Sequence, residues 1–342
     1  MRNPIEKRTV FTGEPLANSS SRLFNNFPLN GMGLRKIRLI LTGTTSAGAA
    51  DPITWGLYQW IKGISLRTSR GEVLYNGVPG MALYKMNQYF DRSSPYHTPI
   101  LAAAGTYYAV LDLPVVFPFL KRPEDTILDT NRYDDLSLEI STGAVGDTLV
   151  TPAANTLVCT LGIELVGTKS AVEMPLAKVA DVTPAQRGKP GYHLYCRTYP
   201  MLHADVATEW LLESNDDLGL LGFMMYNHGA SGIPFIGSVA APANDHPTNV
   251  YFDDVNRIWI NNATPFTFQQ DRQEMCDYNR HGADLVSPVL RLGEYPHSFV
   301  RDGYLGEMYW PGAKAGTRLR WTNATATDET DLVVWGVRNL KP

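Results

Sequence analysis

Hydrophobic and polar residues alternate along many short segments of the chain, and segment 61–84 shows this pattern most clearly. Ile64 and Leu66 alternate with polar neighbours, which is the two-residue period of a half-buried β-strand. A turn follows, an extended run resumes at 73–75, and an Asn-Gly pair then turns the chain again. The next apolar residues have helical spacing: Ala82, Met86, Tyr89 and Phe90. The pattern predicts two strands followed by a short helix.

A similar pattern occurs again near residue 255, which points to an internal duplication. Four pairs of segments match in the same order along the chain: 61–84 with 255–278, 116–118 with 309–311, 136–138 with 319–321, and 158–163 with 332–337. Apolar runs match each other by chance, so each pair alone is weak evidence. Because all four pairs keep their order, a duplicated domain explains them better than chance does.

Strand-like alternation dominates both halves of the chain, and few segments have a helical period. Loops rich in Gly, Pro, Asn and Asp separate the strand segments, and aromatic residues, which favour strands, make up 11% of the chain. These observations predict an all-β protein. We expect two tandem eight-stranded jelly-roll β-sandwiches (a double jelly roll) with few short helices.

The predicted domain order begins with a polar N-terminal arm. Residues 1–30 carry basic residues among Ser and Asn with scattered Phe, and we expect them to form an extended arm rather than a packed layer. The alternating segment 36–41 opens the first jelly roll, which we place at 31–167. A linker without strand periodicity follows at 168–190, and the second jelly roll occupies 191–342.

Composition narrows the classes of function. The chain has 342 residues, which is enough for two domains that each bury a sizeable core. Hydrophobic residues make up 44% and charged residues 19%, so a folded chain is expected rather than a disordered one. The formal net charge is −4, so no overall positive field points to nucleic acid.

The sequence predicts a soluble protein made in a reducing cytoplasm. No stretch reaches the ~18 consecutive apolar residues of a membrane span, and the N-terminal segment lacks the apolar core of a signal peptide. Cys159, Cys196 and Cys276 are far apart and lie within apolar patterns. Their odd number and wide spacing predict buried thiols rather than a disulfide framework or a zinc site.

The candidate metal and acid–base residues lack diagnostic spacing. No H-x-H or H-E-x-x-H arrangement occurs among the seven histidines, so we expect no metal site from them. These histidines are His97, His193, His203, His228, His246, His281 and His297. Two pairs of adjacent carboxylates, Asp216 with Asp217 and Asp253 with Asp254, could bind Ca²⁺ or act in hydrolysis. Asp-rich turns between strands explain both pairs just as well, and we favour turns.

The chain has no nucleophile elbow, Walker loop or dinucleotide fingerprint, so we expect neither catalysis nor a cofactor. Its tryptophans could line a carbohydrate cleft, although sandwich cores and subunit contacts explain them better. They are Trp55, Trp60, Trp210, Trp259, Trp310, Trp321 and Trp335. The small basic cluster of Arg2, Lys7 and Arg8 could attract phosphate groups modestly.

A duplicated jelly roll of this length resembles the double jelly-roll major capsid proteins of tailless icosahedral bacteriophages, in the adenovirus-like capsid lineage. The resemblance covers 36–337 and lies in architecture: the repeated unit at 61 and 255, the closing strands at 158 and 332, and the polar N-terminal segment. No short signature motif defines that family.

The resemblance implies a structural protein of the virion shell that is made in the host cytoplasm. Its expected assembly is a homotrimer with a pseudo-hexagonal outline that contacts neighbouring trimers and a vertex (penton) protein. An internal membrane or the packaged genome would lie below the shell, and Arg2, Lys7 and Arg8 are the candidate residues for contact with the capsid interior. No small-molecule substrate is implied.

Two other classes of protein remain open at this point. The first is a two-domain β-sandwich that binds carbohydrate or cleaves glycans, which would need clustered acids beside exposed aromatic residues. The second is a tail spike or receptor-binding module, which would also form trimers.

Overall fold

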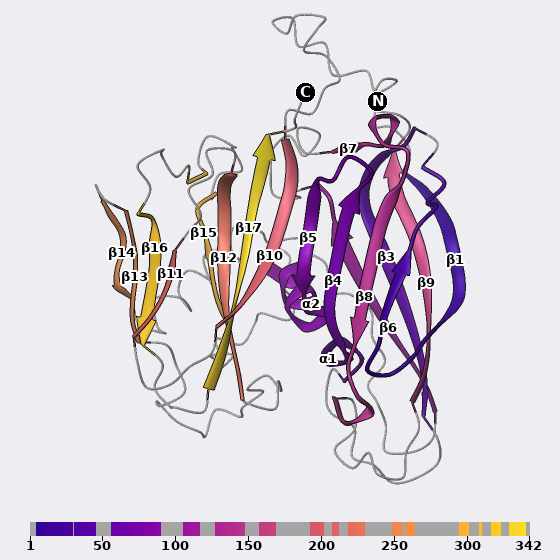
Figure 1. The fold of residues 1–342 in the computed structure, drawn as a ribbon, viewed down its shortest axis with the longest axis horizontal. Helices are drawn as coiled ribbons and strands as arrows, with labels where there is room; N and C mark the ends of the chain where they lie inside the picture. Colours follow the sequence, from indigo (N-terminus) through magenta and orange to yellow (C-terminus); the bar gives the residue numbers. More distant parts are fainter. Residues whose placement is uncertain are drawn as a thin grey trace, which may run out of the picture. The chain divides into compact units, whose positions relative to one another are not determined.

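The computed structural model describes residues 5–29, 31–45, 56–89, 105–116, 127–147, 157–168, 192–201, 207–211, 218–229, 248–254, 257–263, 294–300, 308–309, 316–322 and 328–339. The chain divides into two compact units (Figure 1). The first comprises Met1–Tyr195 with Asn339–Pro342, and the second comprises Cys196–Arg338.

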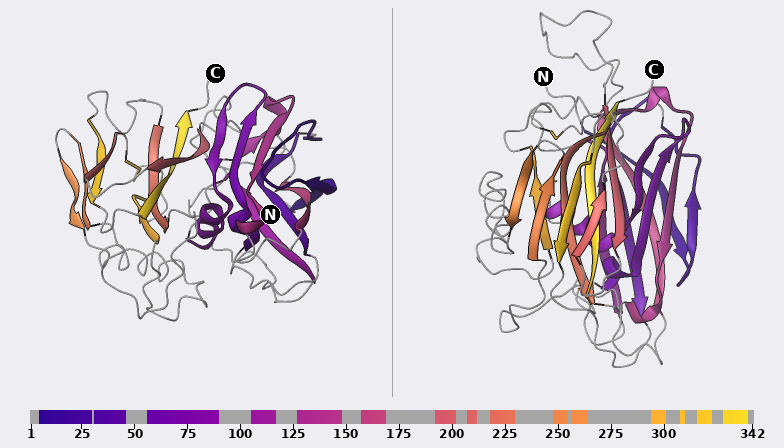
Figure 2. Two further views of the ribbon diagram at one scale, coloured as in Figure 1. Left: turned by 60° about the horizontal axis from the view of Figure 1, so that its bottom comes forward. Right: turned by 60° about the vertical axis from the view of Figure 1, so that its left-hand side comes forward.

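The first unit contains two antiparallel sheets, which appear as two layers of strands in Figures 1 and 2. One sheet has the order β1 (Glu6–Leu16), β9 (Leu157–Thr168), β3 (Gly33–Thr45) and β6 (Gly105–Pro114). The other has the order β2 (Ser21–Phe24), β8 (Leu136–Thr142), β4 (Ile61–Thr68) and β5 (Val73–Val78). The two-residue strand β7 (Leu128–Asp129) pairs with the start of β3.

The second unit contains the same number of principal strands, although the first four residues of β10 and the last residue of β17 belong to the first unit. One group has the order β10 (Tyr192–Met201), β17 (Asp328–Asn339), β12 (Leu218–Gly229) and β15 (Glu294–Ser298). The other sheet has the order β11 (Ala207–Leu211), β16 (Arg318–Thr322), β13 (Thr248–Asp253) and β14 (Ile258–Ala263).

The two units share one topology. When β7 is set aside, the first group of strands in each unit follows the chain order first, eighth, third and sixth. The second group follows the order second, seventh, fourth and fifth in both units. This order, with the last strand lying between the first and the third, is that of an eight-stranded jelly roll. The predicted pair of tandem eight-stranded jelly rolls is therefore confirmed.

The N-terminal segment differs from the expected arm, because it supplies the first two strands of the first jelly roll. β1 pairs along its length with β9, and β2 pairs with β8. The ring of Phe11 packs edge-on against the rings of Phe24 and Phe27, with centroids 5.5 Å apart in each pair. The polar composition misled the prediction because β1 and β2 lie at sheet edges, where many side chains face water. Segment 36–41 consequently lies in the third strand rather than the first.

Two of the four repeat pairs match equivalent strands. Segments 136–138 and 319–321 lie in the seventh strands, β8 and β16, and segments 158–163 and 332–337 lie in the eighth strands, β9 and β17. Inward positions agree as well, because Leu138 and Trp321 are 0% and 1% exposed.

The repeat pair that begins at residue 61 is displaced by one strand. Segment 61–84 begins in the fourth strand, β4, whereas 255–278 reaches the fifth strand, β14, and residues 264–278 lie outside the described part. As a result Ile64 is buried, whereas its assigned counterpart Ile258 is 57% exposed. Neighbouring strands have the same two-residue period, so a gap-free alignment cannot tell them apart.

The helices of the described part are short. They are α1 (Gly56–Trp60), the predicted α2 (Gly80–Tyr89), and two 3₁₀ turns, η2 (Thr130–Arg132) and η3 (Val145–Asp147). α2 contacts β6 of one sheet and β4 of the other, so it covers an edge of the sandwich. Gly80 is required at its start, because an added Cβ would lie 2.7 Å from both Ile61 Cβ and Tyr58 O.

Aromatic side chains fill much of the second core. Phe252 lies 5.2 Å from Phe299 and 5.2 Å from Tyr309 between ring centroids, and Phe223 lies 6.0 Å from Phe252. Four of the five described tryptophans, Trp60, Trp210, Trp321 and Trp335, are 5% exposed or less. Most aromatic residues of the described part therefore stabilise the sandwiches, as the sequence favoured.

The packing of Phe11 predicts that the N-terminal segment contributes to stability. We expect Phe11→Ala to lower the free energy of unfolding by about 2–4 kcal/mol, because it removes ring contacts that hold β1 on the sandwich. Denaturant unfolding measures this change. Thr12→Ala, an exposed change on the same strand, should stay within about 0.5 kcal/mol of wild type. Equal stability of the two variants would show that the segment behaves as an unpacked arm.

Candidate assembly surfaces

The basic residues singled out at the N-terminus lie in different surroundings. Arg2 is outside the described residues. Lys7 is exposed on β1. Arg8 is engaged within the chain, since its guanidinium donates to Glu6 Oε1 at 2.6 Å and to the Pro28 carbonyl at 2.7 Å. Lys7 is thus the better placed of the two described residues to contact another molecule.

The upper part of the β1-β9-β3-β6 sheet carries charges on its outer face. Lys36 and Arg38 project there from β3, and both bind Asp112 of β6, with Lys36 Nζ at 2.5 Å and Arg38 Nε at 2.8 Å. The Asp112 side chain is only 4% exposed. Burial alone would raise its pKa, but the hydrogen bonds and charges of Arg38 and Lys36 outweigh burial and hold the pKa of Asp112 below its ordinary value.

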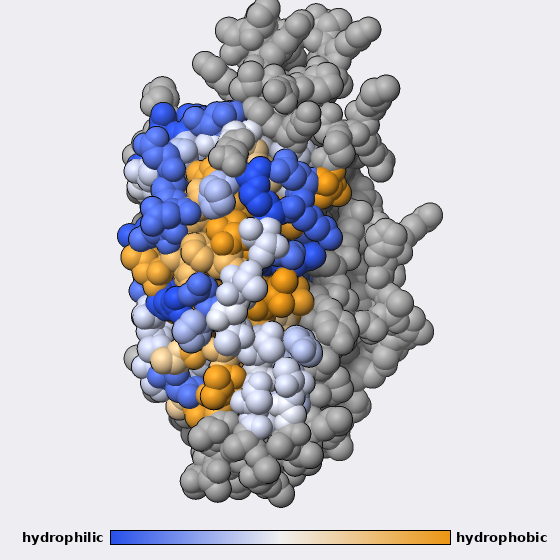
Figure 3. All heavy atoms as spheres, turned by 90° about the vertical axis from the view of Figure 1, so that its right-hand side faces the viewer, coloured by the Kyte–Doolittle hydropathy of each residue, from blue (hydrophilic) through white to orange (hydrophobic). Residues whose placement is uncertain are grey.

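Two rows in the lower part of the same outer face consist of uncharged residues. Its rows run across the strands as Pro15, Thr160, Thr42 and Tyr108, and then Val158, Thr44 and Thr106. Val158 is 62% exposed and Tyr108 43% exposed. Figure 3 shows this side of the first unit, where blue residues are most frequent in the upper part and orange residues occur in both parts. A flat face of β-branched and aromatic residues without charge has the composition of a protein interface centre.

The outer face of the other strand group in the first unit carries small residues, with the exposed Arg67 of β4 opposite Ser137 on the same face. Ser21, Ser141 and Gly63 lie in one row across β2, β8 and β4. Leu23, Glu139 and Ser65 form the next row, in which Leu23 is 55% exposed and Glu139 is also exposed. The surface is therefore shallow, with one exposed leucine directly beside one exposed carboxylate.

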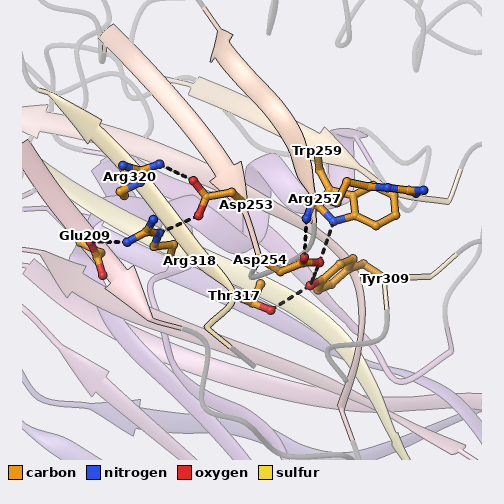
Figure 4. A network of polar contacts seen from close by, with 9 residues as sticks. All are labelled: Glu209, Asp253, Asp254, Arg257, Trp259, Tyr309, Thr317, Arg318 and Arg320. Carbon is orange, nitrogen blue, oxygen red and sulfur yellow. Dashed lines mark hydrogen bonds and ion pairs between the residues drawn. The ribbon is translucent and has the colours of Figure 1, made fainter. Parts of the chain in front are cut away.

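The carboxylate pair Asp253–Asp254 occupies the end of β13 and the turn that follows, as the turn hypothesis predicted (Figure 4). Asp253 is 5% exposed and accepts hydrogen bonds from Arg318 Nε at 2.6 Å and from the Arg320 guanidinium. Two cations from the neighbouring strand β16 therefore neutralise this acid, and a Ca²⁺ ion would have to displace them.

The Asp254 carboxylate forms hydrogen bonds with groups in and near its own turn. Its Oδ1 accepts from the Arg257 backbone N–H at 2.8 Å, and its Oδ2 accepts from Trp259 Nε1 at 3.0 Å and from the Tyr309 hydroxyl at 2.9 Å (Figure 4). Both oxygens thus hold protein donors, and this hydrogen bonding fixes the orientation of the Trp259 ring. The other pair, Asp216–Asp217, lies outside the described residues.

The histidines and cysteines of the described part lie in or near the cores. His193 is buried, and His297 packs against the ring of Phe299 with centroids 4.9 Å apart. Cys159 and Cys196 form no disulfide and are buried, as predicted, and burial raises the pKa of the Cys159 thiol to about 12. Within the described residues, no three His, Cys, Asp or Glu side chains are grouped so that they could hold a metal ion. Cys276 and the remaining five histidines belong to segments whose side chains are not described.

Sequence reasoning missed two features of these surfaces. The Lys36–Asp112–Arg38 cluster joins strands that are far apart in sequence, and only the pairing of Arg38 with Asp112 across β3 and β6 brings them together. Trp259 is the exposed exception among the described tryptophans, at 45%. The sequence carried a weak sign of this exposure. Arg257, Ile258 and Trp259 follow a turn, and turns usually carry small or polar residues rather than large apolar ones.

The same arrangement of strands occurs in solved structures of other proteins. No protein-family model and no curated protein sequence matches the chain. The crystal structure of the STIV MCP superposes with a TM-score of 0.70 at 14% identity, and the match covers 98% of this chain and 97% of that one. This chain has the double jelly-roll fold.

Two further structures support that assignment. The atomic structure of Sulfolobus turreted icosahedral virus gives a TM-score of 0.68 at 14% identity, covering 98% of this chain and 91% of that one. The major capsid protein P2 from bacteriophage PM2 gives 0.60 at 11% identity, covering 99% and 98%. In each comparison the double jelly roll extends over nearly the whole of this chain and of the matched chain. The sequence identities are low, so the similarity is one of fold. Among the described helices, none has the length and apolar character needed to cross a membrane.

The Asp112 cluster predicts a defined pH dependence of stability. We expect Asp112→Asn to lower the free energy of unfolding by about 1–3 kcal/mol at pH 7, because it removes the acid that two bases share. The pKa of Asp112 is depressed in the folded state, so its contribution is present above the unfolded value of about 3.9 and is lost as the pH falls through the folded value.

Chemical denaturation of wild type and Asp112→Asn from pH 7 down to pH 2 checks this behaviour. The difference between them should shrink below about pH 4. Glu6→Gln, which alters a more exposed ion pair on the same sheet, should change stability by less than about 0.5 kcal/mol. A difference for Asp112→Asn that stays constant with pH would contradict the depressed pKa.

Proposed function

We propose that this chain is the major capsid protein of a tailless icosahedral virus. The observation that carries the proposal is the presence of two eight-stranded jelly rolls of identical strand order in one chain. The solved structures that share this fold over nearly their whole length include a major capsid protein of a bacteriophage and an icosahedral virus. A structural role in the virion shell, rather than catalysis, is the function that this architecture best supports.

The proposed assembly unit is a homotrimer. Two jelly rolls of like topology in each chain would give six similar walls around a threefold axis, and thus a pseudo-hexagonal outline that tiles a shell. The contacts would be head to tail, with the first jelly roll of one copy against the second of the next. The uncharged outer face around Tyr108 and Val158 supports such contacts, because interface centres are poor in charge.

Further partners would meet the assembled shell. Neighbouring trimers and a vertex protein would contact its sides, and an internal membrane or the packaged genome would lie beneath it. Arg2, Lys7 and Arg8 remain our candidates for contact with the capsid interior, through attraction to lipid or nucleic-acid phosphates. The exposure of Lys7 supports this role most directly. The protein would be made in the host cytoplasm and would need neither cofactor nor small-molecule substrate.

The rival function, carbohydrate binding or glycan cleavage by two β-sandwiches, gains no support from the described residues. It would require available acids beside exposed aromatic rings. The acids near the exposed Trp259 are Asp253 and Asp254, and their oxygens accept hydrogen bonds from protein groups. We therefore do not propose it.

The trimer gives the proposal a direct test in solution. We expect light scattering to report the mass of three chains, unchanged on dilution to micromolar concentration, because obligate interfaces bury more than about 2,000 Å². A monomer at micromolar concentration would contradict the proposed function.

A further inference from the structure

The start of β14 presents a small exposed surface of large side chains. Arg257, Ile258 and Trp259 follow the turn after β13 in sequence, and we call them the hairpin knob. Ile258 is 57% exposed and Trp259 is 45% exposed, whereas the other described tryptophans are 5% exposed or less. Two large apolar side chains held in water beside an exposed arginine have the composition of a binding hot spot, in which Trp and Arg are enriched.

The hairpin knob is held in one conformation before any partner arrives (Figure 4). Trp259 Nε1 donates to Asp254 Oδ2 at 3.0 Å, and the Tyr309 ring packs against the Trp259 ring in a T-shaped arrangement with centroids 5.3 Å apart. The Arg257 guanidinium lies over the Trp259 ring, 4.7 Å from its centroid. A side chain that is already ordered loses little conformational entropy on binding, so this arrangement favours a specific contact.

The chemistry of the hairpin knob selects the class of partner. A sugar that stacked on Trp259 would also need acceptors and donors beside the ring. The nearest carboxylate is Asp254, and both of its oxygens already accept from Arg257, Trp259 and Tyr309. What the hairpin knob offers is apolar surface together with one exposed cation. Its partner should therefore be a protein surface that is shallow, partly apolar and acidic.

The first unit of the same chain carries a surface of this kind. Leu23 is 55% exposed and lies directly opposite the exposed Glu139 across β2 and β8. The neighbouring positions Ser21, Ser65 and Gly63 are small, which leaves room for a bulky indole to approach the sheet. The Ser21 hydroxyl donates to Glu139 Oε1 at 2.7 Å, so a partner cation would share this carboxylate with Ser21. We call Leu23 and Glu139 the acidic patch. Its exposed leucine matches Ile258 and Trp259, and its carboxylate matches Arg257.

We propose that the hairpin knob of one copy docks on the acidic patch of a second copy. The contact joins unlike surfaces, so it is head to tail and generates a ring when the rotation between copies closes. This inference rests on the proposed capsid function, in which copies of the chain associate, and it assigns residues to one of their contacts. Trp259 and Ile258 bury apolar area there, and Arg257 pairs with Glu139.

A charge reversal in both partners tests the pairing of Arg257 with Glu139. Each of the variants Arg257→Glu and Glu139→Arg should raise the dissociation constant of the oligomer by about tenfold or more, because like charges then face each other. The double variant should return to within about threefold of wild type, because opposite charges face each other again. Analytical ultracentrifugation over a dilution series measures these constants. Arg70→Glu, an exposed change in the turn between β4 and β5, is the matched control and should leave the constant unchanged.

An engineered disulfide tests the proximity of the two surfaces without relying on charge. The double variant Leu23→Cys with Ile258→Cys should form intermolecular disulfides under mild oxidation, since a disulfide needs Cα atoms within about 7 Å. Non-reducing electrophoresis should show bands of two and three chains, and each single variant should show neither. Absence of these bands from the double variant would overturn the docking contact.

The outcomes separate the two proposals. A wild-type oligomer that survives Arg257→Glu, Glu139→Arg and the control equally well would overturn the docking contact and leave the capsid function standing. A wild-type monomer would overturn both. Dissociation by each single reversal, recovery in the double variant and disulfide bands together would establish the contact.

Discussion

Antiparallel pairing of the last strand between the first and third strands is the interaction on which each jelly roll depends. In the first unit β9 pairs with β1 on one side and with β3 on the other, and its inward residues Cys159, Leu161, Ile163 and Leu165 are 0% exposed. In the second unit β17 pairs with β12 along most of its length. Strands from opposite ends of each unit must therefore meet, so long loops have to close before the core can form.

Two acids on the described outer faces are neutralised by bases of the same chain. Asp112 is shared by Lys36 and Arg38 in the first unit, and Asp253 is shared by Arg318 and Arg320 in the second. Each cluster places an acid that is almost buried between two bases from a neighbouring strand. At these two clusters the charges are already paired, so association there would depend mainly on shape and apolar contact.

The sequence predicted those parts of the fold in which apolar residues recur at regular spacing. The seventh and eighth strands of both units and the helix α2 were predicted because buried residues recur at fixed spacing in them. β1 and β2 were missed because most residues of these edge strands are exposed or half-buried. The surfaces were harder to predict. Trp259 is exposed and Trp321 is buried, and the residue type alone does not distinguish them. Contacts such as Arg38 with Asp112 depend on strand register, which no local pattern encodes.

Electron microscopy of the purified protein is the most direct measurement of the central claim, that two tandem jelly rolls build a shell. The account predicts threefold particles with a hexagonal outline, or closed shells built from them, because each chain would supply two of the six walls. Separate two-lobed particles of one chain, seen at every concentration and salt condition, would contradict it.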